Sequence, residues 1–275
     1  MSEPASSGGA AKAGTGPGTV GIGLPGDTPH RTVAKVAALA EQRGLASFWL
    51  NDTPRGDSLE GLLAAAEATR SLRLGSGVIP LDRRASAGIA DDIHRLALPQ
   101  ERLVIGLGAG GLEKPLATVR EGAAALSASV EASVVIGALG PRMRRLAATA
   151  SDGVLLNWLT PEIAAATRDE IHREAAGVGR TGRTALYVRT ALDRDAAEAL
   201  REQAAMYDRI PAYARNFDEL GVSAIDTAIR PDDPIAGRLG AYRAAVDEVV
   251  VRAITADSSE AGYLDFVRRL ADLAA

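Results

Sequence analysis

Residues 133–157 read SVVIGALGPRMRRLAATASDGVLLN and contain one complete strand–helix–strand unit. The apolar run 133–138 predicts a strand, and Pro141 after Gly140 is typical of the first turn of a helix. A second apolar run, 153–157, predicts the next strand. Two strands joined through a helix are the building unit of a parallel sheet.

The same alternation extends in both directions from this unit. Helical spacing follows most of the apolar runs, as in HRTVAKVAALAEQRG at 30–44, where Gly44 is placed to end the helix. Eight such strands predict a (β/α)₈ TIM barrel that forms a single domain over residues 18–275. The predicted strands cover 18–24, 46–51, 72–78, 102–107, 133–138, 153–157, 184–191 and 248–254. The long stretch 192–247 must hold two or three helices, one of them starting at Pro211.

The composition of the chain argues against several classes of function. The chain has 275 residues, a net charge of −4 and no basic stripe, so we expect no nucleic-acid partner. It has no cysteine, and its three histidines are far apart, so no metal site is predicted. No apolar run approaches about 18 residues, so we expect no membrane span and a cytoplasmic location. Residues 1–17 are small and polar and predict a disordered leader.

A glycine cluster at 102–115, RLVIGLGAGGLEKP, fits the G-x-G-x-x-G pattern of dinucleotide-binding turns. A Rossmann fold would also need an acidic residue at the end of the following strand. Glu131 precedes that strand instead, so the context fails. In a barrel these glycines would line the mouth and let a flat cofactor approach the backbone.

Two glycine-bearing strand ends are candidate ligand sites. At 139–142 the amides that open the helix, with Arg142, suit a phosphate; the alternative is a plain helix start with a solvated arginine. At 74–81, LGSGVIPL, the glycines suit a cofactor contact or simply a relaxed exit from the strand.

Together, LGSGVIPL, LVIGLGAGG, GALGPRMRRLAATASDGVLLNWLTPE and VDEVVVRAIT resemble the bacterial luciferase-like flavin and deazaflavin oxidoreductases over residues 18–272. The resemblance implies a (β/α)₈ barrel with coenzyme F420, or alternatively FMN, at its carboxyl-terminal mouth. It also implies a non-prolyl cis peptide at Gly77–Val78 beneath the cofactor ring. The cofactor-binding residues that it implies are Gly75, Gly77, Val78, Gly106, Gly108, Gly110, Leu139, Gly140, Arg142, Asn157 and Trp158.

The chain also departs from parts of this family. Deazaflavin-dependent sugar-phosphate dehydrogenases carry Asp-His where this chain has Asp52-Thr53, and a glutamate where it has Gly111. Glu113 lies two positions later. Losing an acid–base group costs a factor of about 10²–10⁴ in rate, so that activity is not expected. The luciferase reaction is not expected either, because the long loop region of luciferases is absent.

The predicted rim is poor in acids and bases. Asn51 and Asp52 are the candidate catalytic residues, with His30 a distant second; alternatively, Asp52 caps a helix or pairs with an arginine. Arg189 and Arg252 could bind an anionic substrate, pair with Asp247 or Glu248, or face the helix layer.

These features predict an oxidoreductase that moves a hydride between F420, or a flavin, and a small organic substrate. The composition is rich in alanine and arginine, which is associated with genomes of high GC content. Deazaflavin enzymes of this family are common in such genomes, so the composition favours F420. One alternative is an FMN-dependent monooxygenase that uses O₂ and a partner reductase supplying reduced flavin or F420. Another is a non-catalytic flavin- or deazaflavin-binding barrel. We expect a homodimer.

Overall fold

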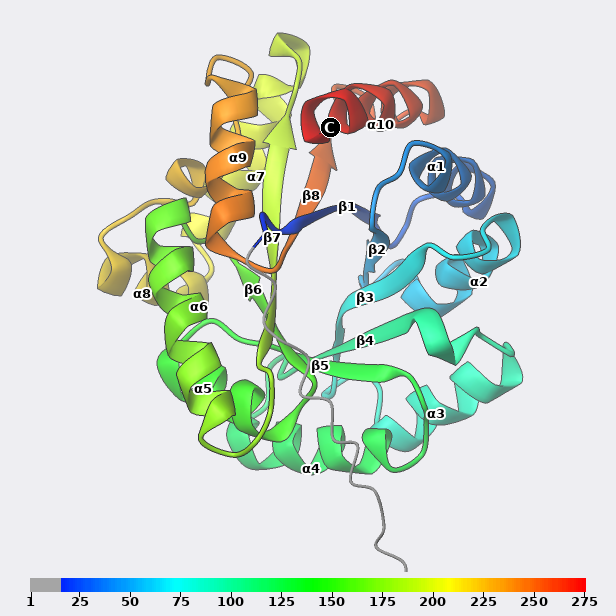
Figure 1. The fold of residues 1–275 in the computed structure, drawn as a ribbon, viewed down its shortest axis with the longest axis vertical. Coiled ribbons are helices and arrows are strands. Elements are labelled where there is room, and N and C mark those ends of the chain that lie inside the picture. The colour runs from blue at the N-terminus through cyan, green and yellow to red at the C-terminus, as the bar shows by residue number, and fades with distance from the viewer. Residues whose placement is uncertain (1–15) are drawn as a thin grey trace, which may run out of the picture.

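The computed structural model describes residues 16–275 of the chain. The first fifteen residues of the predicted leader lie outside the described residues. Eight parallel strands close into a barrel in sequence order, and the helices form a ring around it (Figure 1). The strands are β1 Thr19–Pro25, β2 Ser47–Asn51, β3 Arg73–Pro80, β4 Leu103–Gly108, β5 Ser133–Gly137, β6 Gly153–Asn157, β7 Arg183–Ala191 and β8 Glu248–Ile254.

The predicted single-domain (β/α)₈ barrel is therefore confirmed. Every predicted strand is present, and each boundary lies within two residues of the prediction. The largest difference is β3, which continues to Pro80 instead of ending at Val78.

Helices connect the strands and cover the outside of the barrel. They are α1 His30–Gln42, α2 Ser58–Ala68, α3 Ser86–Arg95, α4 Pro115–Ser127, α5 Pro141–Ala150, α6 Pro161–Ala176, α7 Ala197–Asp208, α8 Pro211–Leu220, α9 Ile235–Ala245 and α10 Glu260–Ala274. Proline opens α5, as predicted, because its missing N–H would be unpaired there in any case. Gly44 follows α1 with a φ of 78°, a conformation that glycine adopts without a side-chain clash.

The stretch between β7 and β8 holds the three helices α7, α8 and α9, and Pro211 begins α8 as predicted. A small aromatic cluster joins α7 and α8 to the end of β6. It consists of Trp158, Tyr207, Tyr213 and Phe217. This segment therefore packs onto the barrel at the carboxyl end of β6.

Two separate cores stabilise the barrel. Most buried apolar side chains lie between the strands and the helix ring. A smaller cluster fills the barrel itself: Trp49, Leu155, Ala185, Tyr187 and Val250. Because side chains alternate along a strand, residues two positions after these inward-facing ones point into the mouth. Asn51, Asn157, Arg189 and Arg252 are placed at the mouth in this way.

Candidate active site

The turn from β5 into α5 lies at the carboxyl-terminal mouth of the barrel. Gly140 precedes α5, no side chain caps the helix, and a Cβ built on Gly140 would meet nothing within 4 Å. The amides of Leu139, Gly140 and Arg142 make no hydrogen bond within residues 16–275. Helix-opening amides carry a partial positive charge, so the turn has the chemistry of an anion site. The Arg142 side chain itself is exposed.

The peptide bond between Gly77 and Val78 is cis, at the bond that the resemblance implied. Gly77 packs closely on a neighbouring side chain, because a Cβ there would lie 2.7 Å from the Tyr187 hydroxyl. Gly75 is covered in the same way by the Trp49 indole, at 2.3 Å from its hypothetical Cβ. These two glycines therefore accommodate barrel side chains.

The glycines at 106, 108 and 110 lie close to other parts of the chain. A Cβ on Gly108 would lie 2.5 Å from Val78, and one on Gly106 would lie 2.4 Å from the Ser76 carbonyl. Gly110, with a φ of 58°, faces the Asp82 carboxylate. Other parts of the chain therefore fill the place that a Cβ would take at each of these glycines, and their contact with a cofactor stays a prediction.

A series of polar contacts crosses the mouth from β3 to β8. Asn51 donates its amide to the Gly77 carbonyl and accepts a hydrogen bond from Arg252 Nε at 3.1 Å. The intervening strand, β1, carries Gly23 at this level, and the Arg252 Cδ lies 3.7 Å from the position of its missing Cβ. The tightest neighbour of that position is the Tyr187 ring, at 2.9 Å, so glycine on β1 makes room for Tyr187 while Arg252 passes beside it to β2.

Arg189 continues these contacts toward β6. It hydrogen-bonds to Asn157 and, at 3.3 Å, to Gln203 on α7. Its guanidinium lies over the Trp158 ring, 3.8 Å from the centroid. Trp158 has a φ of 57° and is only 1% exposed, beneath Tyr207. The structure thus places Asn157 at the mouth and buries Trp158 under the α7–α8 segment.

Arg189 and Arg252 are register partners on β7 and β8, and they are 5% and 8% exposed. Burial lowers the pKa of both guanidiniums. The expectation that they pair with Asp247 or Glu248 is wrong. Asp247 faces Thr184 and His172, while Glu248 binds two other arginines. Those carboxylates stand at the opposite end of the strands.

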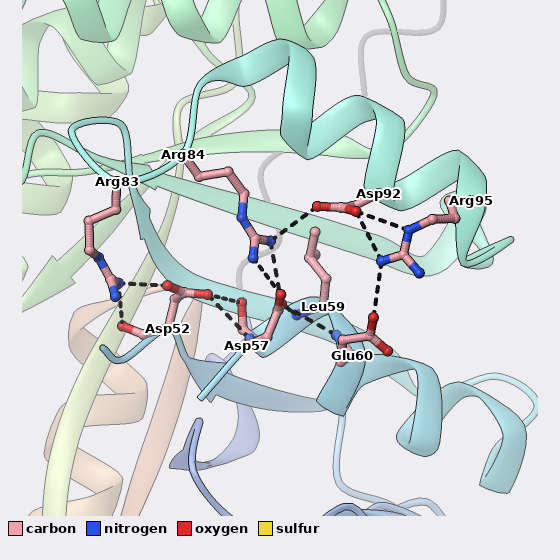
Figure 2. A network of polar contacts seen from close by, with 9 residues as sticks. Asp52, Asp57, Leu59, Glu60, Arg83, Arg84, Asp92 and Arg95 are labelled. Atoms are coloured by element: carbon pink, nitrogen blue, oxygen red, sulfur yellow. Dashed lines mark hydrogen bonds and ion pairs between the residues drawn. The ribbon is translucent and has the colours of Figure 1, made fainter. Parts of the chain in front are cut away.

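Asp52 has a structural partner on each carboxylate oxygen (Figure 2). Its Oδ1 accepts from Arg83 at 2.6 Å, and its Oδ2 accepts from the Ser58 amide at 3.2 Å and the Ser58 hydroxyl at 3.0 Å. Figure 2 also shows Asp57 beside Arg84, in the same network of the loops after β2 and β3. The contacts of Asp52 join the loop after β2 to Arg83 and to the start of α2. The catalytic role of Asp52 stays a prediction.

A model of the family described as luciferase-like monooxygenase matches residues 10–123 and 117–272, which is most of the chain. The chain belongs to this luciferase-like monooxygenase family. Like other members, it is an oxidoreductase built on a single barrel, as the resemblance implied.

A curated relative of this luciferase-like chain is the 5,10-methylenetetrahydromethanopterin reductase of Methanolobus tindarius. It is 30% identical over 223 residues, which cover 66% of this chain and 68% of the relative. The match thus spans about two thirds of the relative's own length.

Two solved structures share the fold of the luciferase-like chain. An F420-dependent secondary alcohol dehydrogenase, in complex with an F420–acetone adduct, has a TM-score of 0.73 at 14% identity and covers 94% of this chain and 99% of its own. The oxygenating constituent of 3,6-diketocamphane monooxygenase from Pseudomonas putida, in complex with FMN, has a TM-score of 0.65 at 14% identity. It covers 94% of this chain and 98% of its own.

Three polar side chains of the luciferase-like site were not predicted: Tyr187, Gln203 and Tyr207. Tyr187 lies two residues before Arg189 on β7, so strand alternation was a signal that both face inward. Gln203 and Tyr207 are four residues apart on α7, which places them on one helix face. That this face meets the mouth was not readable from the sequence.

Two of the histidines of this luciferase-like chain lie at the surface. His30 begins α1 and is exposed, as is His94 on α3. In the part of the chain that the structure describes, no three histidine or acidic side chains are grouped to hold a metal ion. None of the helices over residues 16–275 has the length and apolar character needed to cross a lipid bilayer.

Proposed function

We propose that this chain binds coenzyme F420 at its barrel mouth and transfers a hydride between F420 and a small organic substrate. The observation that carries the proposal is the β5–α5 turn, whose amides at Leu139, Gly140 and Arg142 have no partner among residues 16–275. The site fits a phosphoryl group, because nothing stands over Gly140. The F420-bound barrel of the secondary alcohol dehydrogenase supports this choice of cofactor.

The cofactor, when bound, supplies the hydride chemistry. The residues of this chain provide binding and positioning. Val78, held between the glycines of β4 and β5, offers an apolar surface at the end of β3. Asn51 fixes the Gly77 carbonyl next to it. The α7–α8 segment covers Trp158 and so limits the access of water on the β6 side.

Gly140 offers a direct test of the phosphate turn. Gly140→Asp should weaken F420 binding by about tenfold or more, because its carboxylate would occupy the helix-opening amides and repel a phosphoryl group. The same side chain is a good helix cap and should stabilise the fold by a few tenths of a kcal/mol relative to glycine. Titrations followed by F420 absorbance and fluorescence, with unfolding curves, measure both effects.

Gly140→Ala is the matched control, because its Cβ enters open space and leaves the amides free. It should bind F420 within about twofold of the unsubstituted protein. Equal F420 affinity in the Asp and Ala variants would contradict the proposed phosphate site.

FMN-dependent oxygenation is the second candidate function. The family description and the FMN-bound diketocamphane monooxygenase barrel favour it. Parallel titration with F420 and FMN decides the cofactor, and oxygen uptake with reduced FMN would indicate the monooxygenase. Tight binding without turnover on a substrate panel would indicate a non-catalytic binder.

A further inference from the structure

Arg189 and Arg252 bring two positive charges together inside the mouth. They face each other across the β7–β8 register, and each is more than nine-tenths buried. Guanidinium groups stay protonated in proteins, so burial does not remove the charges. Isolated buried charges cost several kcal/mol each unless an opposite charge or strong hydrogen bonds compensate them.

Within residues 16–275, neutral groups satisfy only part of this requirement. Arg252 donates Nε to Asn51 and Nη1 to the Ala253 carbonyl, while Arg189 donates Nε to Gln203 and Nη1 to Asn157. Neither guanidinium forms an ion pair with a described carboxylate. Glu248, on the same strand as Arg252, already forms ion pairs with Arg73 and Arg183 at the other end of the barrel.

The second terminal nitrogen, Nη2, of Arg252 makes no hydrogen bond to a described residue, while the Arg189 guanidinium also has the neutral Tyr207 hydroxyl beside it. Neither Nη2 is among the fully enclosed atoms that lack a partner. The Tyr187 hydroxyl, two residues before Arg189, is enclosed and also lacks a partner. Two buried guanidiniums therefore lie together without an opposite charge among the described residues, and Arg252 keeps a donor without a partner.

We propose that Arg189 and Arg252 bind a carboxylate of the substrate, one carboxylate oxygen to each guanidinium. The proposal rests on the proposed function and names its substrate class as small organic acids. A carboxylate offers two oxygens to donors on two guanidiniums, and charge-assisted hydrogen bonds of this kind are about twice as strong as neutral ones. Asn51 joins Arg252 to the Gly77 carbonyl, so the acid would lie near the end of β3, where the cofactor ring is proposed.

A phosphoryl group of the cofactor is the other source of an oxyanion. The cofactor phosphate is assigned to the β5–α5 turn, and the arginines lie two and three strands further around the barrel. The open amides at Leu139 to Arg142 already supply that phosphate with donors. The arginine pair is therefore assigned to the substrate, and the two sources give different results in the experiment below.

The test uses the full chain without cofactor and compares benzoate with benzamide at constant ionic strength. Benzoate should bind, seen by calorimetry and by a change in tryptophan fluorescence because Trp158 stacks on Arg189. Benzamide, the neutral analogue, should bind at least about tenfold more weakly, which is the loss of one charge-assisted hydrogen bond. Equal affinities for the two, or no binding of benzoate, acetate or inorganic phosphate, would overturn the proposal.

Variants then locate the site. Arg252→Gln and Arg189→Gln should each weaken benzoate binding about tenfold or more, and Arg252→Lys should recover part of it. Arg243→Gln is the matched control, because Arg243 is a partly buried arginine bonded to backbone carbonyls at Gly18 and Ala274. Unchanged benzoate affinity in folded Arg252→Gln would overturn the proposal. Should that variant not fold, the benzoate–benzamide comparison on the unsubstituted protein still decides.

A cofactor titration separates the two proposals. Arg252→Gln should keep F420 affinity within about threefold, and benzoate should not compete with F420. A tenfold loss of F420 affinity in that variant, with competition by benzoate, would assign the arginines to the cofactor phosphate and overturn the substrate assignment. Failure of both F420 and FMN to bind the unsubstituted protein would reject the proposed function, while benzoate binding would still support the anion site.

Discussion

Val78 and the glycines around it form a close fit between three strands. A Cβ on Gly106, Gly108 or Gly137 would come within 3.2 Å of a Val78 methyl group. The glycine pattern of β4, which resembles a dinucleotide motif, thus has a packing cause in this barrel. The absence of side chains at 106 and 108 makes room for the Val78 side chain.

Asp52 and Arg83 provide a residue-scale prediction. Asp52→Asn should lower the free energy of unfolding by about 1 kcal/mol, because the ion pair with Arg83 is partly shielded from water. Arg83→Gln should cost a similar amount, and the double variant should cost little more than either alone. Urea unfolding of the four proteins measures this coupling. Additive losses, together with a turnover defect of about 10²-fold confined to Asp52→Asn, would instead favour the catalytic role.

At the scale of elements, Glu41 on α1 holds the connection between α2 and β3. Its carboxylate accepts hydrogen bonds from the backbone amides of Arg70, Ser71 and Leu72 and from the Ser71 hydroxyl. Burial alone would raise the pKa of Glu41, but these hydrogen bonds outweigh it and lower the pKa to about 2. One side chain therefore fixes how three neighbouring elements meet.

This lowered pKa gives a pH prediction. A carboxyl group with a depressed folded-state pKa stabilises the fold fully above its unfolded value, here 4.5, and loses that contribution as pH falls toward about 2. Glu41→Gln should therefore lower stability at pH 7 and flatten the decline between about pH 5 and 2. Urea unfolding across this range measures the effect.

Glu67→Gln is the matched control for the pH series, because Glu67 lies on the neighbouring helix α2 and is exposed. It should leave the decline unchanged. The same pH profile for Glu41→Gln and Glu67→Gln would show that the amide contacts of Glu41 do not stabilise the fold.

At the scale of the whole molecule, the two ends of the barrel differ in how their charged side chains are paired. The amino-terminal end is closed by Glu248, which is 2% exposed and contacts Ser47, Trp49, Arg73 and Arg183. These partners join β8 to β2, β3 and β7. The carboxyl-terminal end instead carries Arg189 and Arg252, which have no acidic partner among residues 16–275. Barrels of this kind separate stability from function in the same way.

Glu248→Gln tests this division. Removing the carboxylate leaves Arg73 and Arg183 without their buried counter-charge, so the free energy of unfolding should fall by about 3 kcal/mol. F420 affinity of the folded variant should stay within about twofold, because Glu248 lies far along the strand from the mouth. Glu219→Gln, an exposed position on α8, controls for the chemical change. Loss of F420 affinity without loss of stability would contradict the division.

Much of the architecture was predictable because it depends on local pattern. Alternating apolar runs and helical spacing are set by neighbours within a few residues, and the closed barrel follows from eight such units. Pro141 and Pro211 mark helix starts through their own backbone geometry, so they too were readable. The family resemblance supplied the position of the cis peptide.

The sequence by itself therefore determined the order of the strands and their bounds to within two residues, and so which residues lie near the strand ends. Only the tertiary structure decided which strand-end residues meet and what fills the space between them. Arg252 reaches Asn51 over Gly23, and Val78 occupies the room above Gly108. Such contacts join segments that are distant along the chain. They depend on barrel closure and side-chain packing, which no short stretch of sequence encodes.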